Sequence, residues 1–226
     1  RVVTKRIKNS IISILDVYES KIIVLPIFVD IEKIKKTKSK INLNKKYPQF
    51  DFIILMASRI ENEKNFPLAL GVFKKIIKTK PKTGLIIIGE GKREGFIKNL
   101  VKENDLSKFV IFENWTDNLI PYKTANMFLL KSDYEGYGLT LIEAISSRCP
   151  IVTTRVGIVN EVLEDGVSAL ICNPKDDICL YKKILKLMDN EIDKNKLIKN
   201  ASVSIKKYLI SDKNEYLENY KNVFKL

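Results

Sequence analysis

The chain has 226 residues, of which 45% are hydrophobic and 30% are charged, and its formal net charge is +13. This composition is typical of a globular domain and excludes disordered, collagen-like and coiled-coil chains. The absence of histidine excludes Ser–His and Cys–His nucleophile systems and imidazole zinc sites. No apolar run approaches the roughly 18–20 residues of a membrane-spanning helix. The first residue is Arg1 and no signal peptide opens the chain, so we expect a cytoplasmic chain that is a piece of a longer protein.

The first 50 residues stand apart from the rest. Their apolar spacing predicts a helix at 5–19 and a strand at 21–25, followed by a lysine-rich stretch. We interpret residues 1–50 as the tail of a preceding N-terminal domain plus a basic linker. An anionic membrane surface is the functional alternative to a solvated linker. Aromatic side chains are not interleaved as a base-stacking platform requires, so we expect no nucleic-acid partner. The lysines of this stretch are Lys33, Lys35, Lys36, Lys38, Lys40, Lys45 and Lys46.

From residue 51 onward, short apolar runs alternate with segments of helical periodicity. This alternation predicts a parallel sheet covered on both faces, that is, a Rossmann-like doubly wound α/β domain over residues 51–192. Residues 193–226 are predicted to form two helices that pack back on the fold. The expected strands are 52–57, 84–89, 109–112, 127–130, 150–153 and 169–172, and the expected helices are 65–79, 92–103, 117–124, 138–147, 158–163, 176–188, 194–208 and 212–224.

The cysteines are Cys149, Cys172 and Cys179, an odd number with no C-x-x-C pair. Neither a disulfide framework nor a metal site is expected from this pattern. We predict buried reduced thiols, as in a reducing compartment.

Candidate functional residues follow the strands, because ligands of open parallel sheets bind outside the carboxyl ends of the strands. Arg59 and Lys64 follow the expected strand 52–57, and two cations five residues apart in a loop can converge on one anion. The turn GEGKREG, which begins at Gly89, is neither G-x-G-x-x-G nor a P-loop. It indicates only a glycine-lined turn that can approach a ligand.

The segment EGYGLTLIEA, which starts at Glu135, is the strongest candidate. A carboxylate follows the expected strand 127–130, two glycines turn the chain, and a helix begins whose free backbone N–H groups can bind an anion. Glu143 lies in the second turn of that helix, where side chains lean back toward the N-terminus, so its carboxylate is expected to reach the same ligand site as Glu135. Two carboxylates beside a phosphate-binding helix start suit a sugar nucleotide, since sugar hydroxyls donate to carboxylates.

With seven residues between Glu135 and Glu143, this segment resembles the two-glutamate motif of the retaining glycosyltransferases of family 4. SRIENEK is similar to that family's G-R-x-x-x-E-K stretch, IIIGEG to its V-G-x-G turn, and CPIVTTRVGIVNEVLEDGVSALIC to its P-V segment, in the same order over residues 52–190. The resemblance implies two Rossmann-like domains facing across a cleft (the GT-B fold). This chain would be the C-terminal, donor-binding domain with a remnant of the N-terminal one.

The resemblance also implies roles for individual residues. Arg59 and Lys64 would bind the donor diphosphate and stabilise it as leaving group, Glu135 would contact hydroxyls of the transferred sugar, and Glu143 would hold the ribose. It implies a retaining, metal-independent transfer of a hexose-type sugar from a UDP- or GDP-sugar, with no cofactor. The other expected donor-binding residues are Gly89, Gly136, Tyr137, Gly138, Leu139 and Thr140.

The implied acceptor is a polysaccharide or a lipid-linked glycan of the cell envelope, reached by an enzyme that is cytoplasmic or peripheral at the inner membrane face. The alternative is a non-catalytic nucleotide-sugar-binding module that kept the fold. Because half of the cleft would be absent, we expect the isolated chain to be inactive alone. The sequence departs from the family pattern at Ser58 and at Ile27 and Phe28, where the family has Gly and Asn-Gly, and at Ile158, where a second glycine is common.

Overall fold

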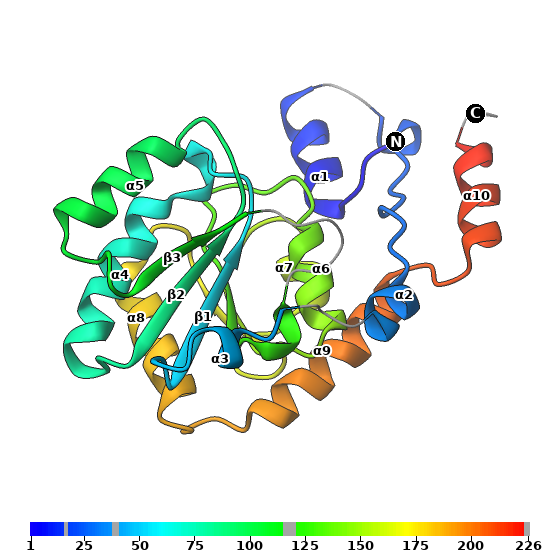
Figure 1. The fold of residues 1–226 in the computed structure, drawn as a ribbon. Coiled ribbons are helices and arrows are strands. Elements are labelled where there is room, and N and C mark those ends of the chain that lie inside the picture. The colour runs from blue at the N-terminus through cyan, green and yellow to red at the C-terminus, as the bar shows by residue number, and fades with distance from the viewer. Residues whose placement is uncertain (16–17, 38–40, 115–120, 224–226) are drawn as a thin grey trace.

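The computed structural model describes residues 1–15, 18–37, 41–114 and 121–223 (Figure 1). Its centre is a six-stranded sheet with the order β3-β2-β1-β4-β5-β6, in which every neighbouring pair is parallel. This order is that of a doubly wound Rossmann-like sheet, so the predicted fold class is confirmed. The strands are β1 (Phe52–Ala57), β2 (Thr83–Ile88), β3 (Val110–Glu113), β4 (Met127–Leu130), β5 (Ile151–Thr154) and β6 (Leu170–Cys172).

The strands were predictable because both faces of the sheet are covered. β1 reads FIILMA and β2 reads TGLIII, which are continuous runs rather than alternating patterns. The two strands pair along their whole length, from Phe52↔Thr83 to Ala57↔Ile88. Each strand expected from residue 51 onward lies within one residue of the observed bounds.

Helices form a layer on each side of the sheet (Figure 1). One apolar cluster contains side chains of the sheet together with α4, α5 and α8, and another contains side chains of the sheet together with α6, α7 and α9. The helices of this part are α4 (Phe66–Thr79), α5 (Glu94–Glu103), α6 (Leu139–Ser146), α7 (Val159–Val162), α8 (Asp177–Met188), α9 (Lys194–Tyr208) and α10 (Lys213–Asn222).

The first 50 residues differ from expectation. The helix α1 (Lys5–Ile14) is shorter than predicted, and residues 21–25, all described, form no strand and contribute only the isolated bridge between Val2 and Val24. The lysine-rich stretch holds two short helices, α2 (Ile31–Lys36) and α3 (Leu43–Lys46). Leu43 is fully buried against the sheet domain, so this stretch is anchored rather than wholly solvated. Lys38 and Lys40 lie outside the described residues.

Two further predicted helices extend beyond the described part. Of the segment 117–124, residues 121–124 are described, and Tyr122–Thr124 form a 3₁₀ turn. The last predicted helix is observed as α10, with Phe224 outside the described residues. The start of the chain contacts α10, because Arg1 Nη2 donates to the Tyr216 hydroxyl at 3.1 Å and its guanidinium lies 5.0 Å from the centre of the Tyr220 ring.

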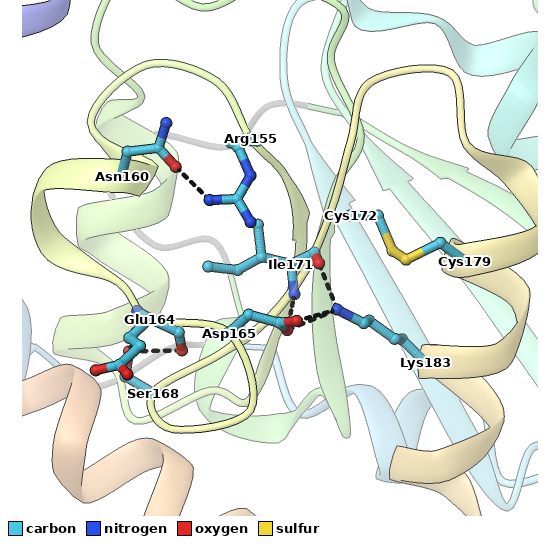
Figure 2. Close-up of polar contacts among 9 residues, drawn as sticks. All are labelled: Arg155, Asn160, Glu164, Asp165, Ser168, Ile171, Cys172, Cys179 and Lys183. Carbon is cyan, nitrogen blue, oxygen red and sulfur yellow. Dashed lines mark hydrogen bonds and ion pairs between the residues drawn. A yellow bond between two sulfur atoms is a disulfide. The ribbon is translucent and has the colours of Figure 1, made fainter.

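The prediction of three reduced thiols was wrong for two of them, because Cys172 and Cys179 form a disulfide (Figure 2). β6 ends at Cys172 and α8 begins five residues later, so the tight turn between them brings the two Cα atoms within 5.8 Å. Counting cysteines could not reveal this proximity. Cys149 is free and buried, and burial raises the pKa of its thiol.

Candidate functional site

The candidate site lies where the strand order reverses. β1 lies between β2 and β4, and the strand order changes direction between β1 and β4. In open α/β sheets, ligands bind at this point, between the loops that follow the two strands. Two hydrogen bonds join these loops. The backbone N–H of Asp133 donates to the Glu63 carbonyl at 2.8 Å, and Asn65 Nδ2 donates to Asp133 Oδ1 at 2.9 Å.

Lys64 and Glu135, two of the predicted catalytic residues, meet across these loops. The Lys64 ammonium Nζ lies 2.6 Å from Glu135 Oε1, and each side chain is only 11% exposed. The Ser132 hydroxyl donates to the same oxygen at 2.7 Å. Asn65 adopts the left-handed conformation (φ 44°) and caps α4, so the chain turns sharply immediately after Lys64. The result is a nearly buried ion pair beyond the carboxyl ends of β1 and β4.

Arg59, the other predicted cation, does not join this pair. Its side chain is 77% exposed, and its Nη2 lies 4.0 Å from Glu63 Oε1. The guanidinium is therefore held only by a loose ion pair at the surface, and its long side chain is free to reorient toward an anion.

Glu143 lies on α6, and its Oε2 accepts a hydrogen bond from the Tyr122 hydroxyl at 2.9 Å. Burial raises the pKa of the Glu143 carboxyl, and the hydrogen bond from Tyr122 opposes this shift. Tyr122 is itself buried and packs edge-on against Phe128, with ring centres 5.3 Å apart. Among the described residues no contact joins Glu143 to Glu135, so it stays a prediction that the two carboxylates reach one ligand site.

The segment from Gly136 to Thr140 forms the turn that leads into α6. Gly138 is the N-cap residue with φ 105°, a conformation that favours glycine, and it provides no side-chain cap. In the part of the chain that the structure describes, the backbone N–H groups of residues 136–140 donate to no other group. These N–H groups are therefore free to bind an anion at the start of the helix.

Gly157 keeps the segment at Tyr137 closely packed. A Cβ atom at Gly157 would lie 2.3 Å from the Tyr137 carbonyl oxygen and 3.1 Å from Glu135 Cβ, and φ is 56°. The Ile158 N–H donates to the same Tyr137 carbonyl at 3.0 Å. The loop after β5 thus supports the back of the glutamate segment.

Gly89 has a comparable packing role beside the loop that carries Arg59. A Cβ atom at Gly89 would lie 2.0 Å from the Ser58 carbonyl oxygen, and one at Gly91 would lie 2.4 Å from the Ile60 carbonyl oxygen. The predicted glycine-lined turn therefore packs directly against the backbone of the 58–60 loop and fixes its position. Direct contact of Gly89 with a ligand stays a prediction.

Helix α1 also contacts the segment that carries Glu135. Arg6 Nη2 donates to the Glu135 carbonyl at 2.5 Å, and its guanidinium lies 5.1 Å from the centre of the Tyr134 ring. The Glu161 carboxylate accepts from the backbone N–H groups of Lys5 at 3.2 Å and Arg6 at 3.4 Å. A polar hollow of about 540 Å³ lies between α1 and α7, and it is lined by Lys5, Arg6, Asn9, Ser10, Ser13, Gly157, Asn160 and Glu161.

The outer part of the β5–β6 region is held by its own polar contacts, shown in Figure 2. Arg155 Nη1 donates to Asn160 Oδ1 at 2.9 Å, and Lys183 Nζ lies 2.6 Å from both carboxylate oxygens of Asp165. Lys183 also donates to the Ile171 carbonyl. The Lys183 contacts join Asp165 and Ile171 to α8.

Four residues at the site were not predicted from the sequence: Lys131, Ser132, Tyr122 and Arg6. A signal for the first two was present, because KS directly follows the buried run MFLL. Tyr122 and Arg6 come from segments distant in sequence, and no local pattern marks them.

No group of three or more His, Cys, Asp or Glu side chains that could hold a metal ion occurs within residues 1–15, 18–37, 41–114 and 121–223. None of the helices in these same ranges is long and apolar enough to cross a membrane.

The fold is that of one Rossmann-like half of a GT-B glycosyltransferase, with two cations after β1 and a helix start with free backbone N–H groups after β4. The chain matches the family model described as Glycosyl transferases group 1 over residues 34–203, and it belongs to this family.

The chain is 26% identical over 180 residues to alpha-monoglucosyldiacylglycerol synthase of Acholeplasma laidlawii, covering 78% of this chain and 44% of that protein. It is 27% identical over 175 residues to poly(glycerol-phosphate) alpha-glucosyltransferase of Bacillus subtilis, covering 76% of this chain and 26% of that protein. The chain thus spans less than half of the length of these relatives.

Solved structures show the same fold. A mutant of S. aureus TarM in complex with fondaparinux, alpha-GlcNAc-glycerol and UDP superposes with a TM-score of 0.82 at 23% identity, covering all of this chain and 43% of TarM. Anabaena HepE in complex with UDP and glucose superposes with a TM-score of 0.83 at 16% identity, covering 99% of this chain and 62% of HepE.

Proposed function

We propose that the chain is the donor-binding part of a glycosyltransferase that moves a hexose-type sugar from a nucleotide-diphosphate sugar to a glycan or lipid-linked acceptor with retention of anomeric configuration. The observation that carries this proposal is the Lys64–Glu135 ion pair, 2.6 Å apart and nearly buried, beside the free N–H groups of residues 136–140. A site with an ammonium, a carboxylate and unpaired N–H donors offers partners for both a diphosphate and a sugar hydroxyl.

In this proposal the donor diphosphate takes the N–H groups at the start of α6. Lys64 turns from Glu135 to a phosphate oxygen, and the exposed Arg59 closes over the other side. Both cations stabilise the charge that develops on the departing nucleoside diphosphate, where fixed charges contribute most to the rate. Glu135, released from Lys64 but still bonded to Ser132, accepts hydrogen bonds from the transferred sugar. No cofactor and no metal takes part.

Glu143 is proposed to hold the ribose of the nucleotide. The Tyr122 hydroxyl occupies Oε2, which leaves Oε1 of the carboxylate to accept from a ribose hydroxyl. Tyr122 therefore selects the orientation in which Glu143 meets the nucleotide.

The relatives support the donor class and the stereochemistry. UDP is bound in the TarM and HepE complexes, and the names of two relatives specify alpha-glucosyl products. An α-linked product formed from an α-linked nucleotide sugar requires retention. Their acceptors, a lipid and a poly(glycerol phosphate) by name, are the basis for proposing an acceptor of the cell envelope.

The acceptor side is proposed to include the hollow between α1 and α7, whose lining offers hydroxyl, amide and charged groups. The exposed lysines Lys33, Lys36 and Lys45 are proposed to attract an anionic membrane that carries the acceptor. Binding to vesicles of 30 mol% phosphatidylserine, measured by co-sedimentation, should weaken on their replacement by glutamine. Unchanged binding, or no binding by the unaltered protein, would remove the membrane from the proposal.

The decisive test is sugar transfer by the protein together with any further domain it carries, with UDP- and GDP-sugars as donors. Lys64→Ala and Glu135→Ala should each lower the transfer rate by about 10²–10³, as removal of single electrostatic groups does in other enzymes. Lys78→Ala, on the exposed face of α4, is the matched control and should change nothing. If neither site variant changed the rate, the catalytic assignment would be wrong. Binding of nucleotide sugar without any transfer would favour the non-catalytic module instead.

A further inference from the structure

Lys131 is a buried amine with no hydrogen-bond partner. It directly follows β4 and is 2% exposed, and its Nζ is unpaired in the described part of the chain. Met127 and Leu129 face the cluster that contains α4, and the alternation of the strand carries Lys131 to the same side. There its Nζ lies 4.1 Å from the centre of the Phe66 ring, in the first turn of α4.

Three charged groups act on Lys131, and all of them belong to the two loops that form the candidate site. Asp133 and Glu135 lie on its own loop, and Lys64 comes from the loop after β1. Burial lowers the pKa of the Lys131 amine well below its usual range, the Lys64 ammonium lowers it further, and the two carboxylates oppose both effects.

The charged form of this amine has little to stabilise it in the ligand-free protein. A buried ammonium needs a hydrogen-bond partner or water, and the Phe66 ring offers only a cation–π contact. Glu135 is paired with Lys64 at 2.6 Å, and Asp133 Oδ1 accepts from Asn65 Nδ2 at 2.9 Å, so both carboxylates that act on Lys131 already have other partners.

We propose that Lys131 is neutral in the ligand-free protein and takes up a proton when a nucleoside diphosphate sugar binds, replacing the positive charge that Glu135 loses as Lys64 turns to the phosphates. This inference rests on the proposed function. The proton comes from solvent and ends on Nζ, and no other bond changes. The incoming diphosphate adds negative charge to the site, which favours the ammonium form of an adjacent amine. Lys131 is thus a positioning residue that acts through Glu135 rather than by contact with the donor.

Proton uptake is measured by titration calorimetry of the protein with UDP-glucose at pH 7.5 in phosphate, HEPES and Tris. The slope of the binding enthalpy against the ionisation enthalpy of the buffer gives the number of protons taken up. UDP-glucose has no group that titrates near this pH, so the slope reports on the protein. The unaltered protein and Lys78→Met should take up a measurable fraction of one proton, and Lys131→Met should take up none.

The pH dependence of the dissociation constant is an independent readout that a merely structural role would not change. Linkage predicts that the unaltered protein loses affinity for UDP-glucose as pH rises above neutral, by up to tenfold per unit, while Lys131→Met stays flat over the same range. A slope in Lys131→Met equal to that of the unaltered protein would overturn the proposal. So would the absence of proton uptake in the unaltered protein.

Failure of the proposed function gives a different result. If neither UDP-glucose nor GDP-mannose binds, the donor assignment fails and the role of Lys131 falls with it. Binding without proton uptake refutes only the role of Lys131. Met is apolar and of similar length, so Lys131→Met should fold; if it does not, Lys131→Leu is the second variant, and the measurement on the unaltered protein still decides.

Discussion

Breaking the Lys64–Glu135 ion pair should destabilise the protein in a way that a double-mutant cycle can isolate. Loss of one partner from a buried pair costs about 3–5 kcal/mol, whereas an exposed pair contributes about 0–1 kcal/mol. Both side chains are 11% exposed, so this pair is close to the buried limit. In Lys64→Met, however, Glu135 keeps its hydrogen bond from Ser132. We therefore expect a loss of about 2–3 kcal/mol in the free energy of unfolding.

The assay is urea or thermal unfolding of Lys64→Met, Glu135→Gln and the double variant. For a chain of this size, a loss of 2–3 kcal/mol lowers Tm by about 4–12 °C. The double variant leaves no unpaired charge, so its loss should be smaller than the sum of the single losses. The resulting coupling energy is expected at about 1–3 kcal/mol.

The matched control is the exposed pair between Lys98 and Glu94 on α5, whose side chains are 47% and 32% exposed. Its coupling energy should be below about 0.5 kcal/mol. A coupling energy at the Lys64–Glu135 pair no larger than that of the control would show that the pair does not hold the two loops together. The argument from burial would then be wrong.

Three further predictions concern other parts of the molecule. Because the pKa of Lys131 is lowered in the folded state, the unfolded chain binds more protons, and stability should rise with pH from neutral toward the unfolded pKa near 10.4. The rise should be at most about 1.4 kcal/mol per pH unit. Urea unfolding at several pH values should show it in the unaltered protein and not in Lys131→Met. Reduction of the disulfide between Cys172 and Cys179 should lower the free energy of unfolding by about 2 kcal/mol. Dithiothreitol should therefore lower the Tm of the unaltered protein but not that of a Cys172→Ala variant. An equal Tm of the unaltered protein with and without reductant would contradict this prediction. Gly157→Ala should lower Tm by several degrees, since its Cβ would meet the Tyr137 carbonyl at 2.3 Å, and an unchanged melting curve would show that the loop shifts freely.

Much of the fold was predictable because its signals are local. The runs FIILMA and MFLL are apolar throughout, and β1 and β4 lie at the bounds that the sequence indicates. Right-handed crossovers between parallel strands then place helices on both faces of the sheet. The order β3-β2-β1-β4-β5-β6 itself follows from no local pattern. The segment 21–25 has a similar apolar run but finds no neighbouring strand in the described residues except the bridge at Val24, so composition alone misled there.

The candidate site was predictable in part. The residue types that follow the strands indicated Lys64 and Glu135 as site residues, and in the structure these two form an ion pair. Their mutual ion pair, the exposure of Arg59 and the hydrogen bond from Tyr122 to Glu143 depend on side-chain geometry across loops, which no spacing rule describes. The disulfide was missed for the same reason, since it depends on the path of one turn.

The contacts of α1 have a consequence for recombining this chain with its relatives. Glu161 binds the backbone at the start of α1 and also accepts from the Tyr208 hydroxyl of α9, while Arg6 holds the Glu135 carbonyl. A chimera in which a relative's sequence replaces everything before a junction between α1 and β1 would separate these partners. The junction therefore has to keep α1 with the sheet domain, or the incoming segment must bring a helix start and a guanidinium that fit the same carboxylate and carbonyl.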